Sequence, residues 1–362
     1  MDFLSRKLQQ RKDANAFRQL RMPDGGIDFC SNDYLGIVKN KLIRFAHDHE
    51  VYGSTGSRLI SGNYPLIEEV ERQLSAFHQA EAALIFNSGY DANTGLLGAV
   101  PQRGDTVLYD QLSHASIRDG IRLSLANSFS FEHNDIDDLE KKLQLAKGKV
   151  FVVTESVFSM DGDTAPLVEI ASLCDEYNAL LIVDEAHATG VIGEKGEGLV
   201  QALGLQQKCF ARLHTFGKAV GCHGAAVLGS QLLRDYLVNF SRPFIYTTAL
   251  PSSAVRAIGA AYALLPAMRE ERQHLNGLIR VFREKATGMR LCKSQTPIQG
   301  IIIPGNENVK RSAALLQERG FDVRPILYPT VPKDRERLRI VLHAFNTEQE
   351  LIRLISTVGA AC

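Results

Sequence analysis

A cluster of ionisable residues follows an apolar run near the middle of the chain. In the stretch "LLIVDEAHATG" (180–190), Asp184 directly follows four apolar residues and His187 comes three residues later. Such a run is typical of a buried strand, and a buried carboxylate requires a partner. A protonated heterocyclic nitrogen would serve, because the acid keeps the ring charged and the ring keeps the acid ionised. Taken alone, Asp184 could equally be a helix cap or a surface acid, and His187 an ordinary polar residue.

A lysine with small and apolar neighbours offers a second reactive group. Lys218 lies in "HTFGKAVG" (214–221), whereas most lysines are solvated surface residues. A lysine shielded from water has a lowered pKa and becomes a nucleophile toward carbonyl groups. The glycines on both sides let a bulky group approach the backbone.

Two further stretches follow predicted strands. The residues "NSGY" (87–90) precede a predicted helix, whose first backbone N–H groups could bind an anion, although an ordinary turn has the same composition. His114 follows "YDQLS" (109–113) and could stack on an aromatic cofactor or lie beside a helix cap. A nucleophilic lysine, an acid for a pyridinium nitrogen and a phosphate seat are together the requirements of pyridoxal 5'-phosphate, PLP.

Composition and motifs argue against several other functions. The letters DEAH (184–187) also mark helicases, but Gly217–Lys218 is followed by Ala219, so the phosphate loop of a nucleotide hydrolase is missing. Lys plus Arg equals Asp plus Glu, 41 each, which gives no electrostatic support for a nucleic-acid partner.

Other features of the sequence indicate a cytoplasmic protein. The N-terminus lacks the apolar core of a signal peptide, and no apolar run is long enough to span a membrane. The six cysteines form no CxxC pair, which is typical of reduced thiols rather than a disulfide or zinc framework, and HExxH is also missing. We therefore expect no metal site.

The alternation of strands and helices predicts the fold that positions these groups. Strands are expected at 82–86, 105–110, 149–156, 179–186, 209–215 and 225–230, with helices between them. This order predicts an α/β fold with a mostly parallel sheet covered on both faces. Ligands bind beyond the carboxyl ends of such strands. Five consecutive strand ends carry polar groups: the four described above, and Ser156 with Ser159 after the strand at 149–156.

The texture of the sequence changes after residue 250. A long helix interrupted near Pro266 is followed by short strands at 298–303 and 337–343 and helices at 308–319 and 347–358. Residues 1 to about 20 also look helical. We therefore expect an N-terminal arm (1–45), a large PLP-binding domain (46–250) and a smaller C-terminal α+β domain (251–362).

The order of these motifs resembles the α-oxoamine synthase family, within the PLP-dependent transferases of fold type I. The similarity runs nearly end to end. The matching stretches are "FCSNDYLG" (29–36), "GSTGSRLISG" (53–62), "FNSGY" (86–90), "LSHASIRDG" (112–120), "TESVFSMDGDTAPL" (154–167), "VDEAHATGVIGEKGEG" (183–198), "TFGKAVG" (215–221), "FIYTTALP" (244–251) and "PTVPKDRERLRI" (329–340).

This resemblance implies a homodimeric enzyme with shared active sites. It implies the decarboxylative condensation of an amino acid, L-alanine favoured, with a pimeloyl thioester of coenzyme A or a carrier protein, in biotin biosynthesis. Alternatives are a glycine acetyltransferase, a serine palmitoyltransferase-like synthase, an aminotransferase of the same fold, or a scaffold without cofactor. Intact Lys218, Asp184, His187 and Arg339 argue against the scaffold.

The resemblance also assigns roles around the cofactor. Lys218 should form the Schiff base and move the substrate proton, Asp184 should pair with the ring nitrogen, and His114 should stack on the ring and aid the acyl carbonyl. The remaining cofactor contacts implied are His187 and Ser159 near the phenolic oxygen, Gly89 and Tyr90 through their backbone, Thr215 near the phosphate, and Thr247 or Thr248 at the phosphate of the partner subunit.

Substrate contacts follow from the same resemblance. Arg339 should grip the amino-acid carboxylate with Asn32 near it, since a guanidinium fork suits that target. Arg18 and Thr330 match substrate-contacting positions, and Glu155 matches an acid near the site. Two departures concern the acyl entrance: many relatives carry Arg-Pro-Pro where this chain has 327–329, "LYP", and usually glycine where it has Asp334.

Overall fold

The chain folds into two units in a computed structural model, which describes residues 2–20, 22, 25–45 and 52–359. The larger unit comprises Leu35–Phe158 and Thr164–Arg269. The smaller unit comprises Met1–Tyr34, Ser159–Asp163 and Glu270–Cys362. The expected limit at 45/46 borders residues outside the described part, and the segment 251–269 groups with the larger unit. The three-domain division stays a prediction.

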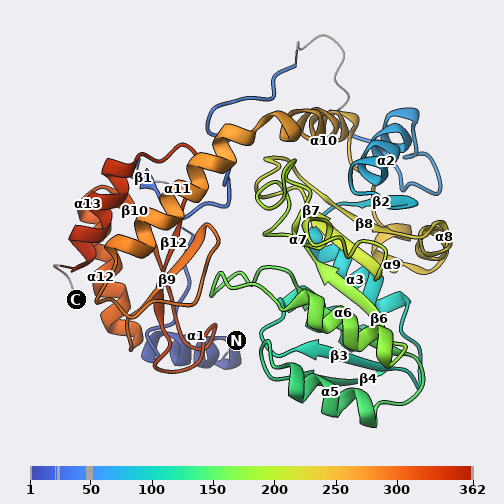
Figure 1. Ribbon diagram of the computed structural model, residues 1–362, viewed down its shortest axis with the longest axis horizontal. Coiled ribbons are helices and arrows are strands. Elements are labelled where there is room, and N and C mark those ends of the chain that lie inside the picture. The colour runs from blue at the N-terminus through green and yellow to red at the C-terminus, as the bar shows by residue number, and fades with distance from the viewer. Residues whose placement is uncertain (1, 21, 23–24, 46–51, 360–362) are drawn as a thin grey trace. The chain divides into compact units, whose positions relative to one another are not determined.

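The larger unit is built on a seven-stranded sheet (Figure 1). Its order is β2 (Ala82–Phe86), β8 (Ala225–Gly229), β7 (Cys209–Thr215), β6 (Leu180–Asp184), β5 (Val150–Glu155), β3 (Thr106–Asp110) and β4 (Asn127–Phe131). Every pair from β7 to β4 is parallel, and β8 runs antiparallel to both of its neighbours. The predicted mostly parallel α/β fold is confirmed.

The directions of the strands bring the polar strand ends to one edge. Because β8 is antiparallel to both β2 and β7, strand β2 points the same way as β7, β6, β5 and β3. The five polar strand ends expected from the sequence therefore lie at the same edge of the sheet. The register pairs Glu155 with Asp184 across neighbouring strands, and Asp184 with Leu213.

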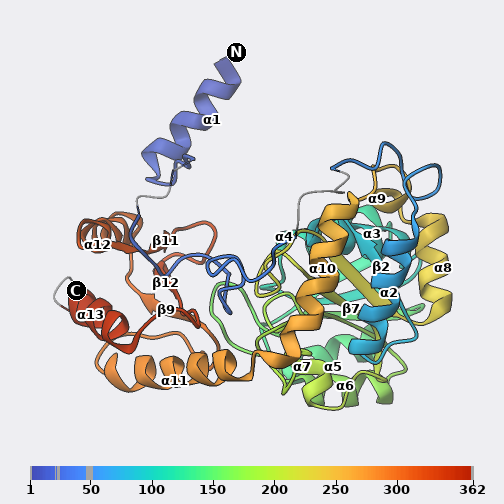
Figure 2. The ribbon, with the colours of Figure 1, turned by 90° about the horizontal axis from the view of Figure 1, so that it is seen from above.

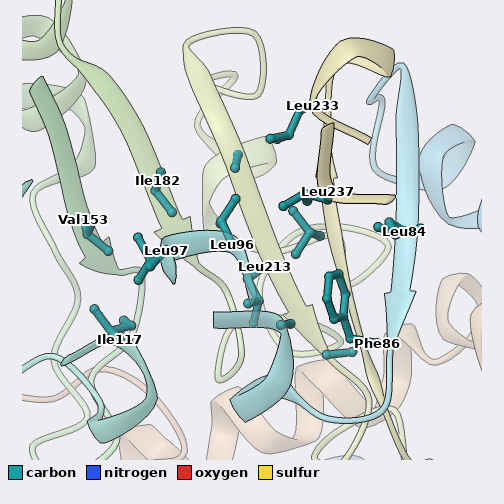
Figure 3. Packing of buried hydrophobic residues seen from close by; sticks show 14 of the residues in the cluster. Leu84, Phe86, Leu96, Leu97, Ile117, Val153, Ile182, Leu213, Leu233 and Leu237 are labelled. Atoms are coloured by element: carbon teal, nitrogen blue, oxygen red, sulfur yellow. The ribbon is translucent and has the colours of Figure 1, made fainter. Parts of the chain in front are cut away.

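Helices cover both faces of this sheet, so its central strands are apolar on both sides. One buried cluster joins α3 (Gly89–Ala99), α4 (Ala115–Leu123) and α8 (Gln231–Phe240) to the strands. Figure 3 shows Leu96 and Leu97 of α3 among strand residues that include Ile182 and Leu213. A second cluster packs α5 (Ile136–Leu145) and α6 (Leu167–Glu176) on the other face.

Four more helices complete the larger unit. Two are short, α7 (Leu199–Ala202) and α9 (Arg242–Ile245), and two pack as a pair, α2 (Pro65–Phe77) and α10 (Ser252–Leu264). Helix α2 runs beside α10 (Figure 2), where the Gln73 side-chain amide donates to the Gly259 carbonyl at 3.0 Å. Within the described residues, no helix combines the length and apolar character needed to cross a membrane.

The smaller unit is an α+β fold, as expected. An antiparallel sheet has the order β11 (Arg324–Ile326), β12 (Arg337–Val341) and β9 (Ile298–Ile302), and β1 (Ile27–Asp28) pairs with β10 (Phe321–Asp322). Its helices are α1 (Asp2–Asp13), α11 (Arg269–Lys285), α12 (Asn306–Glu318) and α13 (Glu348–Gly359). Helix α1 ends earlier than expected, whereas the predicted interruption at Pro266 is confirmed by a 3₁₀ turn, Leu265–Ala267.

A buried ion-pair cluster connects α2 to β2, an edge strand of the seven-stranded sheet. The Glu71 carboxylate accepts from Arg58 Nη1 at 2.7 Å and from Arg234 Nη2 at 3.1 Å. Its Oε1 also accepts from the backbone N–H of Ile85 in β2 at 2.9 Å. Glu71 and the Arg58 side chain are both buried, so each charge depends on the other for its solvation.

Glu71→Ala should lower the free energy of unfolding of the larger unit by about 3–5 kcal/mol, because two arginines lose their carboxylate. Chemical denaturation of this variant against the wild type measures the loss. Glu69→Ala, an exposed change on the same helix, is the matched control and should stay within about 0.5 kcal/mol. A loss below about 1 kcal/mol for Glu71→Ala contradicts the assigned role.

Candidate active site

A buried carboxylate stands at the carboxyl end of β6. The Asp184 residue is 6% exposed. Its Oδ2 accepts from Asn93 Nδ2 of α3 at 2.8 Å, and its Oδ1 accepts from the backbone N–H of Ala186 at 2.9 Å. Both donors are neutral, so they orient the anion without neutralising it. A cationic ring N–H is the kind of ligand group that such a carboxylate can bind.

Asn93 links this carboxylate to His114, which follows β3 at the same edge of the sheet. The Asn93 amide also donates to Ser116 Oγ at 3.0 Å, and that hydroxyl lies 2.8 Å from His114 Nδ1. The backbone N–H of Ser116 donates to the same Nδ1 at 3.2 Å, so His114 caps α4. A neutral His114 ring therefore carries its proton on Nε2.

Two buried glutamates near these residues have raised pKa values. Desolvation, reinforced by the negative charge of Asp184, raises the pKa of Glu155 to about 8. Glu155 Oε1 accepts from the backbone N–H of His114 at 2.7 Å. Desolvation likewise raises the pKa of Glu185 to about 7, although that carboxylate accepts from the backbone N–H groups of Leu199 and Val200 at the start of α7.

Lys218 lies on the turn that follows β7. The residue is half-buried, and Phe216, Ala219 and Val220 around it are fully buried. Desolvation lowers the pKa of His114, the charge of Asp184 opposes this, and the charge of Lys218 adds to the lowering. Lys218 also acts against the rise in the pKa of Glu155. These interactions place Lys218 near His114, which follows β3, and near Glu155 at the carboxyl end of β5. His187, three residues after Asp184, is buried.

The start of α3 forms a close contact with the end of β7. Gly89 is the first residue of α3, and Ser88 Oγ accepts from the backbone N–H of Asp91 at 3.0 Å. A Cβ atom at Gly89 would stand only 3.3 Å from Thr215 Oγ1, so a side chain there would crowd the space beside the helix start. Tyr90 points elsewhere, since its hydroxyl donates to Asp119 of α4.

Thr247 and Thr248, the threonines expected to reach the phosphate of the partner subunit, lie beside Asn87. Asn87 comes just before α3. The Asn87 amide donates to Thr247 Oγ1 at 3.1 Å and to the Thr248 carbonyl at 2.9 Å. These bonds tie the 247–248 loop to the end of β2.

The candidate carboxylate-binding residues come together within the smaller unit. Arg339 of β12 donates through Nε to the Ser159 carbonyl at 2.7 Å and through Nη2 to Asn32 Oδ1 at 3.1 Å. Tyr34 also donates its hydroxyl to Asn32 Oδ1, at 3.2 Å. Ser159, expected among the cofactor contacts, belongs to this smaller unit, whereas the other expected cofactor contacts belong to the larger unit.

Arg18 and Thr330, the other two expected substrate contacts, lie next to each other. Arg18 Nη2 donates to Thr330 Oγ1 at 3.3 Å. Asp334, in place of the glycine common among relatives, has φ of 63°, in the left-handed region that favours glycine but tolerates Asp. The backbone conformation that suits glycine there is thus kept.

The family model for aminotransferase class I and II matches residues 24–358. The chain belongs to the aminotransferase class I and II family. It is 41% identical to an 8-amino-7-oxononanoate synthase of Emericella nidulans, covering 99% of this chain and 95% of that protein. It is 40% identical to the same enzyme of Marinobacter nauticus, covering 98% and 95%.

Solved structures extend the similarity to the fold. The 8-amino-7-oxononanoate synthase of Francisella tularensis has a TM-score of 0.80 at 29% identity, covering 93% of this chain and 98% of that chain. A serine palmitoyltransferase from S. paucimobilis with a bound PLP–myriocin aldimine has a TM-score of 0.88 at 28% identity, covering 99% and 96%. The resemblance to PLP-dependent α-oxoamine synthases of fold type I is confirmed.

Asn93, Ser116 and Glu185 were not among the sequence-predicted site residues. Asn93 and Ser116 lie inside α3 and α4, where nothing in the local pattern distinguishes them from ordinary polar helix residues. Glu185 had a weak signal, since it directly follows Asp184 at the end of an apolar run.

The raised pKa of Glu155 predicts that the apoprotein loses stability as pH rises. Between the ordinary value of 4.5 and about 8, the folded state holds a proton that the unfolded chain has released. Glu155→Gln should therefore flatten the fall of melting temperature between about pH 5 and 8. Glu169→Gln, an exposed change on α6, is the control. An unchanged slope in Glu155→Gln contradicts the assignment.

Proposed function

We propose that this chain is a PLP-dependent acyltransferase that condenses L-alanine with a pimeloyl thioester, releases carbon dioxide and yields 8-amino-7-oxononanoate for biotin biosynthesis. The proposal draws its substrates from the named relatives, which match at about 40% identity over nearly the whole chain. The observation that carries the chemistry is the Asp184–Asn93–Ser116–His114 network at the edge of the sheet.

The residues present fit PLP. The Asp184 carboxylate suits the ring N–H⁺, because its own partners are neutral and it is buried. The start of α3 at Gly89, next to Thr215, suits the phosphate, since helix N–H groups bind anions. When bound, PLP draws electrons from the substrate carbon that loses a proton.

The chain's own residues then hold and move protons. We assign Lys218 as the covalent attachment point and as the base that takes the proton from the amino acid, since a deprotonated amine can both attack a carbonyl group and accept a proton. His114, with Nδ1 committed to Ser116, presents Nε2–H as a hydrogen-bond donor for the acyl carbonyl. His187 is assigned a contact with the phenolic oxygen of PLP.

We assign the amino-acid carboxylate to Arg339 and Asn32. Hydrogen bonds to Ser159 and Asn32 hold the Arg339 side chain in place, which lowers the cost of ordering it around a carboxylate. Arg18 and Thr330, which hydrogen-bond each other, are assigned to the substrate.

Three finer assignments belong to the same proposal. We infer a homodimer in which Thr247 or Thr248 reaches the phosphate of the partner subunit. The acyl carrier is coenzyme A or an acyl carrier protein, and the cytoplasm is the compartment that the scattered cysteines favour.

A synthase that uses serine or glycine is the second candidate, because solved serine palmitoyltransferases match the fold closely. Incubating the holoenzyme with alanine, serine or glycine, each with pimeloyl thioester, and measuring free thiol separates these functions. Mass spectrometry of the alanine product tests the proposal directly. Conversion of PLP to its amine form without release of carbon dioxide would instead indicate an aminotransferase.

Lys218→Ala should abolish turnover and the visible absorption of the bound cofactor, because the covalent attachment and the base are both lost. Lys208→Ala removes a surface lysine that pairs with Asp175, and serves as the control. A Lys218→Ala protein that stays yellow with a borohydride-reducible link to another lysine would show that the assignment is wrong.

Arg339→Lys should raise the KM for L-alanine by about tenfold or more, because an ammonium cannot reproduce the two-pronged contact of a guanidinium with a carboxylate. The KM for the acyl thioester should stay within about twofold. Steady-state kinetics with each substrate varied in turn measures both values. Equal increases for the two substrates argue against a carboxylate role.

A further inference from the structure

Asn32 lies in a segment that is held by hydrogen bonds from two buried residues, His343 and Asn346. The segment 28–34, "DFCSNDY", follows β1 and carries Asn32 and Tyr34. The last residue of β12 and the residues that follow it contact this segment. The backbone N–H of Val341 donates to the Phe29 carbonyl at 2.9 Å, and that of Ala344 donates to the Tyr34 carbonyl at 2.8 Å.

Asn346 fixes the beginning of this segment. Its Oδ1 accepts from the backbone N–H of His343 at 2.9 Å, which identifies that atom as the oxygen. The other end of the amide, Nδ2, donates to the Asp28 carbonyl at 3.1 Å. The Asn346 carbonyl lies 2.8 Å from His274 Nε2 of α11, so the asparagine is itself held in place.

His343 reaches the residue directly before Asn32. Its ring is fully buried and stacks on Phe345, with centroids 4.6 Å apart and an interplanar angle of 9°. Nδ1 lies 3.0 Å from Asn346 Oδ1 and must donate, because that oxygen can only accept. Nε2 lies 3.1 Å from Ser31 Oγ and 3.0 Å from the Ser31 carbonyl.

The ring holds Ser31 in either protonation state. A neutral ring accepts at Nε2 from the Ser31 hydroxyl, and a protonated ring donates to the Ser31 oxygens. Asp28 completes the turn, since its Oδ1 accepts from the backbone N–H groups of Cys30 and Ser31 at 2.8 and 2.9 Å. The backbone that precedes Asn32 is thus fixed from both sides.

The orientation of Asn32 matters for the ligand. Its Oδ1 faces Arg339 Nη2 and the Tyr34 hydroxyl, so the amide presents Nδ2–H as its donor end. A carboxylate needs donors, and a rotated amide would present oxygen instead. We propose that His343 is a positioning residue, which holds Ser31 so that Asn32 keeps Arg339 aligned and directs its N–H group at the substrate carboxylate.

This inference rests on the proposed function for the identity of the substrate. It also links two parts of one chain segment, because Arg339 lies in β12 and His343 follows only four residues later. The arginine and the histidine that positions its partner Asn32 therefore belong to the same short stretch of chain.

The test is a double-mutant cycle on the holoenzyme. His343→Gln should raise the KM for L-alanine by about tenfold, with kcat and the KM for the acyl thioester within about twofold. In an Asn32→Ala background, the same substitution should change the KM for alanine by less than about twofold, because residues that act through one another are not additive. Multiplicative effects in the double variant overturn the proposal.

A stability control separates positioning from general damage. His78→Gln alters an equally buried histidine of the larger unit, which hydrogen-bonds Tyr262 at 3.1 Å. It should lower the melting temperature and leave the KM for alanine unchanged. A matching rise in that KM would mean that any destabilised variant shows the effect, and would overturn the inference.

A further measurement keeps the inference distinct from the proposed function. If the wild type releases no thiol from alanine and pimeloyl thioester, the proposed function fails. Hydrogen exchange still tests the positioning role. His343→Gln should speed exchange of the Cys30 and Ser31 amides, which donate to Asp28. Unchanged exchange of both amides refutes it.

Discussion

The candidate site depends on one constraint: a carboxylate held away from water at the carboxyl end of a strand in a mostly parallel sheet. Asp184 is oriented by an amide and a backbone N–H, neither of which carries charge. Such an anion is costly unless a cation joins it. Its field also raises the pKa of Glu155 and opposes the desolvation that lowers the pKa of His114. The protonation states around the site thus respond to whatever binds Asp184.

Much of the larger unit is readable from the sequence because its strands are apolar on both faces. The strands at 82–86 and 209–215 were predicted with the bounds observed. Strand β4, "NSFSF", was missed because it is a largely exposed edge strand with three polar residues. The antiparallel direction of β8 was not predicted either, since an apolar run carries no information about direction. The two-residue strands β1 and β10 are too short to produce a pattern.

Some residues of the site can also be predicted from the sequence, and others cannot. Asp184 and Lys218 stand out from their sequence neighbours, because a charged group beside apolar residues is unusual. Asn93 and Ser116 do not, since their importance arises only when α3 and α4 meet at the strand ends. The contact between Arg339 and Asn32 spans 307 residues, and only a family resemblance could suggest it. Partners far apart in sequence are invisible to periodicity, which reports burial and not proximity.

The interleaving of the two units has a consequence for handling the protein. The chain passes between them at 34/35, 158/159, 163/164 and 269/270. Neither unit is therefore a contiguous fragment, and no single truncation yields either one intact. A single cut at any of these passages would give two covalently separate fragments that each contribute to the smaller unit, so non-covalent packing within that unit would hold them together. Limited proteolysis should consequently give nicked protein that stays associated on native gels, and smaller bands only after denaturation.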